Sequence, residues 1–374
     1  MTAVAILGSG VMGSALAVPL ADNGHDVRLI GTHLDRDIID SIRDTGVHPG
    51  LGVELPGSVQ AYQIEEAEAG FSGVEILLSG VNSFGVRWAS DQLARLLPDD
   101  TLVIAIAKGL EATDQGDLRL LPDVLTERWS EQQRAAIPVS AIVGPSIAGE
   151  VAVRRDTCVV FAGPDQAALD RLADTFRTER YRVWTSTDLA GCEVCAAMKN
   201  CFALALGLAE GELEAQGGAD AQYRMHNYEA AVFAQGAIEM RQMVALLGGL
   251  PETTHGLAGV GDMYVTCTGG RNVRVGRLIG TGMEFTEAWE QLDHVTLEGA
   301  AAIRQLGAAL PKLSARGIIG AEDFPLLRHL YEIIELERPV NIPWSSFFGG
   351  QAATTPASGA DGHEQPLAEP RGEG

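Results

Sequence analysis

Lys199 stands on the apolar side of a predicted helix, which is an unusual place for a charged residue. Residues 188–213 read DLAGCEVCAAMKNCFALALGLAEGEL, and apolar residues such as Cys192 and Phe202 recur at the three- and four-residue spacing of one helical stripe. Asp188 is suited to cap the first turn. One interpretation is a stem that carries the ammonium group of Lys199 into solvent. The other is a catalytic lysine facing a cleft, where loss of water lowers its pKa enough for proton transfer near neutral pH.

A second pattern that could form part of a functional site lies near the N-terminus. An apolar run over residues 3–8 predicts a buried strand, and the stretch from Gly8 to Gly13 reads GSGVMG ahead of a helical segment. In this strand–turn–helix context the pattern G-x-G-x-x-G predicts a dinucleotide site, because its glycines form the turn, admit a pyrophosphate and let helix and strand pack closely. The residues predicted to contact the cofactor here are Gly8, Gly10, Val11, Met12 and Gly13.

The end of the next strand bears on which dinucleotide is bound. Residues 25–30 form that strand, and an NAD-selective enzyme usually has an acidic residue directly after it, bonded to the ribose 2′-hydroxyl. Here Thr32 and His33 follow instead, and with Arg36 they could accommodate a 2′-phosphate. The pattern therefore favours NADPH, and NADH is the alternative if Asp35 reaches the ribose.

Strand and helix signals alternate as far as residue 187 and predict an α/β fold with a Rossmann-type doubly wound sheet. Further strands are expected at residues 74–81, 101–107, 138–143, 158–162 and 181–184. Polar groups at the carboxyl ends of such strands face the ligand crevice. Lys108 follows one strand, and Gly144 begins the loop after another, so Lys108 is a candidate site residue with a solvated loop lysine as the alternative.

After residue 187 the strand signals stop and long helical patterns follow. We expect a dinucleotide-binding domain over residues 1–187, an all-helical substrate and catalytic domain over 188–345, and a disordered tail over 351–374, which is poor in large apolar residues. The boundary places Lys108 and Lys199 in different domains, so a cleft between the domains would bring them together.

The helical domain holds a second set of candidate site residues. Arg271 and Asn272 open a predicted helix after two glycines, where backbone N–H groups and a guanidinium can hold a phosphate. Asp262, in a glycine-rich turn, could orient Lys199 or a substrate hydroxyl. The competing interpretations are a surface arginine and an aspartate that only closes its own turn.

Composition limits the partners of the chain. With 50 acidic residues against 27 basic ones, the formal charge of −23 argues against nucleic acid or an anionic membrane as the main partner and leaves room for a small anionic substrate. The five cysteines indicate reduced thiols of a cytoplasmic protein, and no metal site is predicted. The N-terminus lacks a signal-peptide pattern, and no window approaches the ~18 uninterrupted apolar residues of a membrane span.

Taken together, these motifs resemble the NAD(P)-dependent sn-glycerol-3-phosphate dehydrogenase family over most of residues 1–345. The matching segments are GSGVMGSALA from Gly8, AKGLE from Ala107, GPSIAGEVA from Gly144, AAMKN from Ala196, GLAGVGDMYVTCT from Gly256, GGRN from Gly269 and LEG from Leu297. The resemblance implies a Rossmann domain joined to a helical domain, usually as a homodimer. It also implies an oxidoreductase of glycerophospholipid metabolism that interconverts dihydroxyacetone phosphate and sn-glycerol 3-phosphate with NADPH or NADH.

The resemblance also implies roles for individual residues. Lys199 becomes the proton-transferring residue, and Lys108 and Asp262 share the catalytic site with it. The implied substrate site comprises Lys108, Gly144, Ser146, Lys199, Asp262, Thr266, Arg271 and Asn272. The implied cofactor site adds Thr32, His33, Lys108, Ala148, Arg271 and Glu298 to the glycine motif.

The chain departs from the family pattern beside the cofactor site. Gly10 and Val11 stand where the bacterial pattern usually has serine and an aromatic residue, and the third strand ends in Asn82 where proline is usual. Gly149 replaces a residue that is commonly charged. Two alternatives therefore stay open: the same chemistry on another phosphorylated 2-ketone or polyol, and a nucleotide-binding regulator without turnover.

Overall fold

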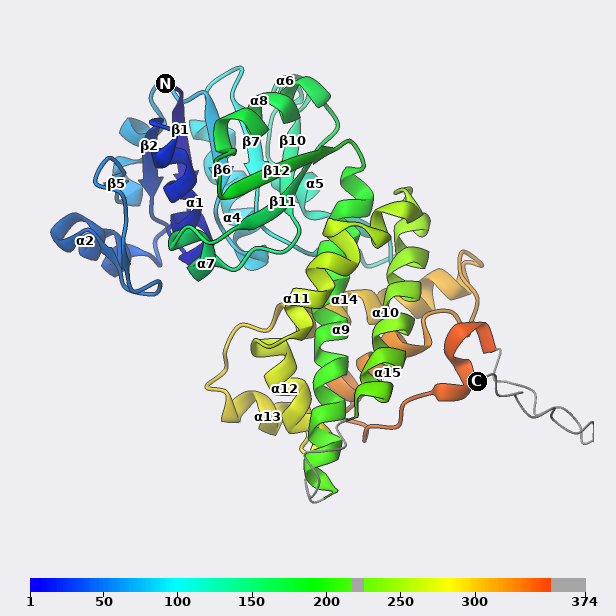
Figure 1. Ribbon diagram of the computed structural model, residues 1–374. Helices are drawn as coiled ribbons and strands as arrows, with labels where there is room; N and C mark the ends of the chain where they lie inside the picture. Colours follow the sequence, from blue (N-terminus) through cyan, green and yellow to red (C-terminus); the bar gives the residue numbers. More distant parts are fainter. Residues whose placement is uncertain (217–224, 351–374) are drawn as a thin grey trace, which may run out of the picture.

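The computed structural model describes residues 1–216 and 225–350, which form a sheet-containing part followed by a helical part (Figure 1). One eight-stranded sheet has the order β12-β11-β10-β7-β6-β1-β2-β5. Its neighbouring strands are parallel except for β10 and β11. The strands are β1 (Ala3–Leu7), β2 (Asp26–Ile30), β5 (Gln60–Tyr62), β6 (Ile76–Ser79), β7 (Leu102–Ala105), β10 (Val139–Val143), β11 (Thr157–Ala162) and β12 (Tyr181–Ser186). The predicted α/β fold class is confirmed, and the predicted tail over 351–374 lies outside the described residues.

Helices cover both faces of this sheet because its strands are apolar on both sides. On one face, α1, α2, α7 and α8 form a core that includes Leu16 and Leu172. On the other face, α3, α4 and α5 form a core that includes Phe71 and Leu93. The helices of this part are α1 (Val11–Asp22), α2 (Arg36–Thr45), α3 (Ala67–Phe71), α4 (Val86–Leu96), α5 (Leu121–Leu125), α6 (Glu131–Ala136), α7 (Ala148–Ala152) and α8 (Gln166–Phe176).

Strand β1 has β2 on one side and β6 on the other, so the strand order reverses at β1 although all three strands are parallel. A ligand crevice forms at such a switch point, outside the carboxyl ends of the strands. The loops after β1 and β6 approach so closely that a Cβ on Gly8 would lie 2.9 Å from the carbonyl carbon of Gly80. Gly8 also has a φ of +111°, which favours glycine. The glycine motif is therefore placed at the crevice.

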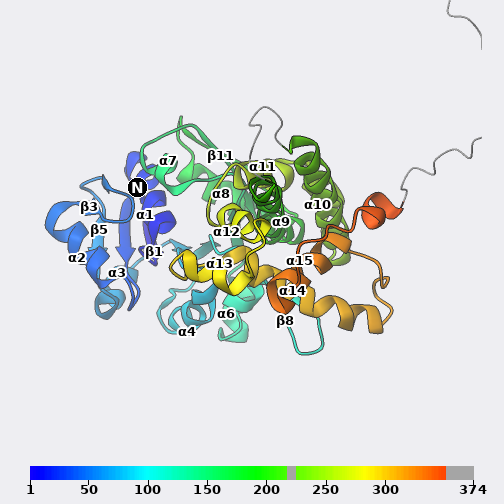
Figure 2. The same ribbon diagram turned by 90° about the horizontal axis from the view of Figure 1, so that it is seen from below.

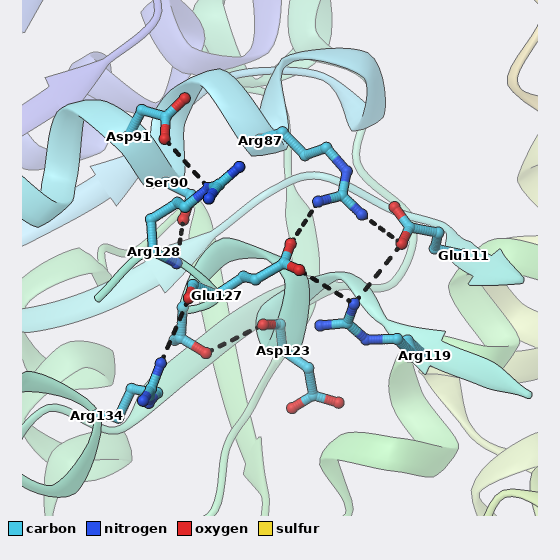
Figure 3. A network of polar contacts seen from close by, with 10 residues as sticks. Arg87, Ser90, Asp91, Glu111, Arg119, Asp123, Glu127, Arg128 and Arg134 are labelled. Carbon is cyan, nitrogen blue, oxygen red and sulfur yellow. Dashed lines mark hydrogen bonds and ion pairs between the residues drawn. The ribbon is translucent and has the colours of Figure 1, made fainter. Parts of the chain in front are cut away.

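Two short hairpins lie beside the sheet. The first pairs β3 (Val47–His48) with β4 (Val53–Glu54), and the second pairs β8 (Leu110–Ala112) with β9 (Leu118–Leu120). A charged network fixes the second hairpin to α4 and to the segment after α5 (Figure 3). Arg87 lies 2.6 Å from Glu111 and also pairs with Glu127, while Arg119 lies 3.8 Å from Glu111 and 3.7 Å from Glu127. Because these side chains are partly exposed to solvent, the network orients the hairpin more than it stabilises the fold.

The helical part is built around α9 (Figures 1 and 2). Helix α9 packs against α10, α11, α12 and α14. The helices are α9 (Leu189–Ala215), α10 (His226–Leu246), α11 (Asp262–Cys267), α12 (Arg271–Gly280), α13 (Phe285–Gln291), α14 (Glu298–Ala315) and α15 (Pro325–Leu336). The predicted cap is confirmed, since Asp188 accepts a hydrogen bond of 3.0 Å from the Gly191 N–H.

The prediction of a single apolar stripe on α9 is wrong. Nearly every residue from Gly191 to Gly211 is buried, so neighbours surround the helix on all sides. Small residues make this close packing possible: a Cβ on Gly207 would lie 2.2 Å from the Val273 carbonyl oxygen of α12. By length and composition α9 could cross a membrane, but 83% of its most apolar window is buried within the fold. Its apolar character is explained by its place in the core.

Candidate active site

Two lysines meet at one buried carboxylate between the sheet part and the helical part. The chain has three lysines, Lys108, Lys199 and Lys312, and the first two both contact Asp262. Lys199 Nζ pairs with Asp262 Oδ1, and Lys108 Nζ lies 3.1 Å from Asp262 Oδ2. Lys108 Nζ also donates to the Gly144 carbonyl at 3.4 Å. Four residues predicted from the sequence are therefore brought together, and each comes from a different element or loop.

The fold positions each member of this cluster separately. Lys108 follows β7 and Gly144 follows β10, which are neighbouring strands of the sheet. Lys199 lies in the middle of α9. Asp262 is the first residue of α11, directly after a π-helical turn over Leu257–Gly261, so the predicted glycine-rich turn is itself helical. A Cβ on Gly259 in that turn would lie 2.1 Å from the Thr254 carbonyl oxygen, and this explains the need for glycine.

Burial gives the two ammonium groups different pKa values. The pKa of Lys199 falls to about 7 because burial and the nearby charge of Lys108 outweigh the attraction of Asp262. Burial acts on Lys108 in the same direction, but Asp262 and Glu298 outweigh it and raise the pKa of Lys108. The cluster therefore contains one fixed cation and one group that can exchange a proton near neutral pH. The interpretation of Lys199 as a solvent-exposed stem is wrong, since its side chain is only 9% exposed.

The predicted phosphate-binding residues lie at the start of α12. Gly270 precedes it with a φ of +101°, and Arg271 is exposed as the first helical residue. The Asn272 side chain donates to Asn200 Oδ1 at 3.1 Å and accepts from the Gly299 N–H at 3.1 Å. Asn272 therefore ties α12 to the residue after Lys199 and to the start of α14. Asn200 was not identified from the sequence, although its position next to Lys199 is a usable signal.

Thr266 and Glu298 lie near the lysine cluster on two different helices, α11 and α14. The Thr266 hydroxyl donates to the Asp262 carbonyl at 2.7 Å and so supports the turn that carries this aspartate. Glu298 begins α14 and lines a cavity of about 250 Å³ together with Lys108. The charged network of Figure 3 borders the same cavity through Arg87 and Glu111. This cavity extends from the lysine cluster between the sheet part and α14.

The glycine motif fits a bound dinucleotide. A Cβ on Gly13 would lie 2.4 Å from the Gly8 carbonyl oxygen, whereas nothing lies within 4 Å of a Cβ on Gly10. One side of the loop is thus closely packed and the other is open, as the approach of a pyrophosphate requires. The Ser9 hydroxyl is buried without a partner in the described part of the chain. Exposed apolar side chains lie at this edge of the sheet: Val11, Leu34, Phe84 and Ile147.

The end of β2 contains the residues predicted to select the cofactor. Thr32 is buried and accepts from the Leu34 N–H at 3.2 Å, while His33 lies against the Trp88 ring with 5.6 Å between centroids. Arg36 forms an ion pair with Glu65, and Asp35 accepts from two backbone N–H groups. The structure thus places the acidic candidate, Asp35, in contact with the glycine loop at Ser9, and Arg36 next to it in the chain.

The GPSIAGEVA segment lies on the other side of that loop. Ser146 Oγ is 3.8 Å from Met12 Sδ, which joins the predicted substrate segment to the predicted cofactor segment. Ala148 is the first residue of α7, and α7 packs against α1. Nothing lies within 4 Å of a Cβ on Gly149, so the missing charged residue leaves open space and the local backbone does not require glycine there.

Glu193 is a buried carboxyl group that the sequence patterns did not single out. It lies on α9 and is fully buried, and neither of its carboxyl oxygens has a partner in the described chain. Burial raises its pKa to about 8, although the charge of Lys108 acts in the opposite direction. A charged residue within an apolar stretch is the signal that could have identified it.

Glu193→Gln is expected to remove part of the pH dependence of stability. The pKa of Glu193 in the folded protein lies above the value of 4.5 for an ordinary glutamate, so the folded state holds the extra proton between these values. Binding of this proton adds to the free energy of unfolding. The contribution is fully present below pH ~4.5 and is lost as pH rises through ~8, and it amounts to on the order of 2–4 kcal/mol. Urea unfolding at pH 5 and pH 8.5 measures this loss, and an equal loss in both proteins would contradict the assignment. Glu131→Gln, on exposed α6, is the control.

Comparison with known proteins identifies the family of the chain. Residues 3–169 match the family model described as NAD-dependent glycerol-3-phosphate dehydrogenase N-terminus, and residues 188–343 match the model of its C-terminus. The NADP(+)-dependent glycerol-3-phosphate dehydrogenase of Archaeoglobus fulgidus is 37% identical over 78% of this chain and 83% of its own. The glycerol-3-phosphate dehydrogenase [NAD(P)+] of Shouchella clausii is 33% identical over 89% of this chain and 92% of its own.

Solved structures give the same result. The crystal structure of glycerol-3-phosphate dehydrogenase from Coxiella burnetii superposes with a TM-score of 0.74 at 30% identity, covering 92% of this chain and 96% of that one. Both family models together span the sheet part and the helical part, including the cluster of Lys108, Lys199 and Asp262. The chain belongs to the NAD-dependent glycerol-3-phosphate dehydrogenase family.

Proposed function

We propose that this chain catalyses reversible hydride transfer between NAD(P)H and dihydroxyacetone phosphate, giving sn-glycerol 3-phosphate, with Lys199 as the proton donor and acceptor. The observation that carries this proposal is the buried Lys199, which shares Asp262 with Lys108 at the ligand edge of the sheet. The family membership supports the reaction class. The two functional units of the proposal are a cofactor domain over residues 1–187 and a substrate domain over 188–345.

The cofactor supplies the hydride when it is bound, and the protein residues handle the charge and the proton. As C2 of the substrate becomes an alkoxide, Lys199 Nζ gives it a proton, and in the reverse direction the neutral amine takes the hydroxyl proton. Lys108 remains cationic because its pKa is raised, so it stabilises the developing negative charge. Asp262 pairs with both lysines, one through each carboxylate oxygen, and so keeps the two amino groups next to each other. Lys199 transfers the proton and Lys108 supplies the positive charge because their pKa values shift in opposite directions.

The phosphate group of the substrate is assigned to the start of α12. Arg271 is exposed there, and no ion pair engages it among residues 1–216 and 225–350. Its guanidinium can bind a phosphate through two parallel hydrogen bonds, and the first backbone N–H groups of a ten-residue helix add to the attraction. Asn272 links this helix start to α9 beside Lys199, so phosphate binding and carbonyl orientation are coupled.

The proposal includes cofactor choice, assembly and location. NADPH is favoured over NADH on the grounds of Thr32, His33 and Arg36, and the Archaeoglobus relative, named as NADP(+)-dependent, supports this choice. Asp35, which faces the same loop, is the reason to test NADH in parallel. A cytoplasmic homodimer is the proposed working form: the family resemblance of the sequence implies the homodimer, and the five cysteines indicate the cytoplasm.

Reduction of dihydroxyacetone phosphate is expected to consume the absorbance of NADPH, and the rate is expected to fall as pH rises through about 7. The reason is that Lys199, with a pKa of about 7, must carry its proton to act as the acid. The assay compares NADPH with NADH, and dihydroxyacetone phosphate with larger ketose phosphates, from pH 6 to pH 9. Preference for a larger ketose phosphate would support the alternative substrate, and no turnover with any of them would reject the enzymatic proposal.

A further inference from the structure

We propose that His48 is a positioning residue for the cofactor, because it fixes the glycine loop in the orientation that binds a pyrophosphate. The proposal rests on the assignment of Gly8–Gly13 to the cofactor. His48 lies on the β3–β4 hairpin, outside every motif that identifies the family in this chain. It is fully buried, and both of its ring nitrogens have backbone partners.

The two partners determine which ring nitrogen bears the proton. Nδ1 lies 3.1 Å from the Leu51 N–H, which can only donate, so Nδ1 must be the acceptor. Nε2 lies 2.9 Å from the Ser9 carbonyl oxygen, which can only accept, so Nε2 must carry the hydrogen. His48 is therefore a neutral imidazole that donates one hydrogen bond to the glycine loop. The hairpin holds this ring by donating the Leu51 N–H to Nδ1, and the Nε2–H is directed at the Ser9 carbonyl.

The Ser9 carbonyl is held from a second side as well. The Ser14 hydroxyl of α1 donates to it at 3.0 Å, and the Ser9 N–H donates to Asp35 at 3.1 Å. Gly50 completes the contact, since a Cβ there would lie 3.3 Å from the His48 ring and 3.1 Å from Val11. The hairpin thus packs directly against the first residue of α1. The Ser9 carbonyl is thus held by two side chains, His48 and Ser14, that are both buried.

The consequence follows from the planarity of the peptide bond. The Ser9 carbonyl and the Gly10 N–H belong to one trans peptide, so they point in opposite directions. When His48 and Ser14 hold the carbonyl inward, the Gly10 N–H points the opposite way, away from these two side chains. Nothing lies within 4 Å of a Cβ on Gly10 either, so the backbone of this residue is open to an approaching group. No acceptor within the described residues takes this N–H. It is therefore available to a phosphate oxygen, and His48 orients it without touching the cofactor.

The test uses two substitutions that each keep one of the two ring contacts. In His48→Gln the amide nitrogen can take the place of Nε2 and keep the bond to Ser9. In His48→Asn the shorter amide can take the place of Nδ1 and keep only the bond to Leu51. A single neutral hydrogen bond contributes on the order of 1 kcal/mol, so His48→Asn is expected to raise KM and Kd for NADPH by about three- to tenfold. For His48→Asn, kcat and the KM for dihydroxyacetone phosphate are expected to stay within about twofold of wild type, and His48→Gln is expected to retain tighter NADPH binding than His48→Asn.

A merely structural role predicts a different pattern. In that case both variants would lose stability together, and kcat and both KM values would change alike or not at all. His48→Phe, which keeps a buried ring and removes both nitrogens, tests the proposal if the asparagine variant does not fold; it should weaken NADPH binding as well. Wild-type NADPH affinity in a folded His48→Asn or His48→Phe protein overturns the inference and leaves the proposed reaction standing. If wild-type protein binds NADPH but does not reduce dihydroxyacetone phosphate, the proposed reaction is wrong. The Kd values of the variants for NADPH then still decide the role of His48.

Discussion

Lys199→Ala is expected to lower kcat for reduction of dihydroxyacetone phosphate by 10²–10⁴-fold, on the order of 3–5 kcal/mol in the barrier. The substituted protein has no group at this position that can give a proton to the alkoxide. Asp262 keeps Lys108 as its partner at 3.1 Å, so the substitution does not leave a buried carboxylate without a counter-charge. For this reason the fold is expected to survive and NADPH affinity to change little.

Two further variants separate proton transfer from positive charge. Lys199→Arg retains a cation beside Asp262, but a guanidinium holds its proton across the whole working pH range. It should be nearly as inactive as the alanine variant if proton transfer is the role of Lys199. Lys312→Ala, which removes the third lysine from the exposed surface of α14, is the matched control and should leave kcat unchanged. Activity of Lys199→Ala within about tenfold of wild type would show that another group is the acid.

The sequence is a good guide to this site because the signals are local. Lys199 lies on the apolar side of its predicted helix, which allowed either a stem reaching solvent or a lysine facing a cleft, and its 7% exposure excludes the exposed stem. Residues at the carboxyl ends of parallel strands meet at one edge, so Lys108 and Gly144 were predictable as neighbours without knowing the rest of the fold. The same reasoning predicted seven of the eight strands of the main sheet, since each is an apolar run. It missed β5 and both hairpins, whose strands are only two or three residues long.

Other features depend on contacts between distant segments and could not be predicted in this way. The burial of α9 on all sides comes from close backbone packing against α12, and a hydrophobic stripe seen in one helix does not reveal its partners. The hydrogen bond from His48 to Ser9 joins residues 39 positions apart through a two-residue strand, which is too short to produce a pattern. The lack of a hydrogen-bond partner for Glu193 within the described residues likewise depends on which distant segments surround it, and the sequence alone does not show this.

The opposite pKa shifts of the two lysines follow from their burial and from the single carboxylate between them. Two buried ammonium groups with one counter-charge cannot both remain protonated at low cost, because the repulsion between like charges is strong where water is excluded. The group with less compensation loses its proton first, and here this is Lys199, whose pKa falls while that of Lys108 rises. Asp262 thus sets the pH at which Lys199 can act. Substitution of Asp262 therefore tests both the geometry and the chemistry.

Asp262→Asn is expected to destabilise the fold by about 3–5 kcal/mol and to lower kcat at pH 7.5 by at least ~10²-fold. The asparagine fills the same volume but removes the carboxylate that pairs with both Lys108 and Lys199. Since Asp262 raises the pKa of Lys199, its loss moves that pKa below about 7, and the acidic form needed for carbonyl reduction disappears at neutral pH. The pH–rate profile for reduction should shift toward acid, so activity relative to wild type recovers partly as pH falls.

Urea unfolding and the pH dependence of kcat distinguish this account from a simple loss of structure. Unfolding alone would lower activity equally at every pH, whereas the change in the pKa of Lys199 lowers it most on the alkaline side. The control is Asp114→Asn on the exposed β8–β9 turn, where the same chemical change should alter neither stability nor the profile. An Asp262→Asn protein with an unshifted profile would show that Asp262 only supports α11 and that the pKa of Lys199 is set by burial and Lys108 alone.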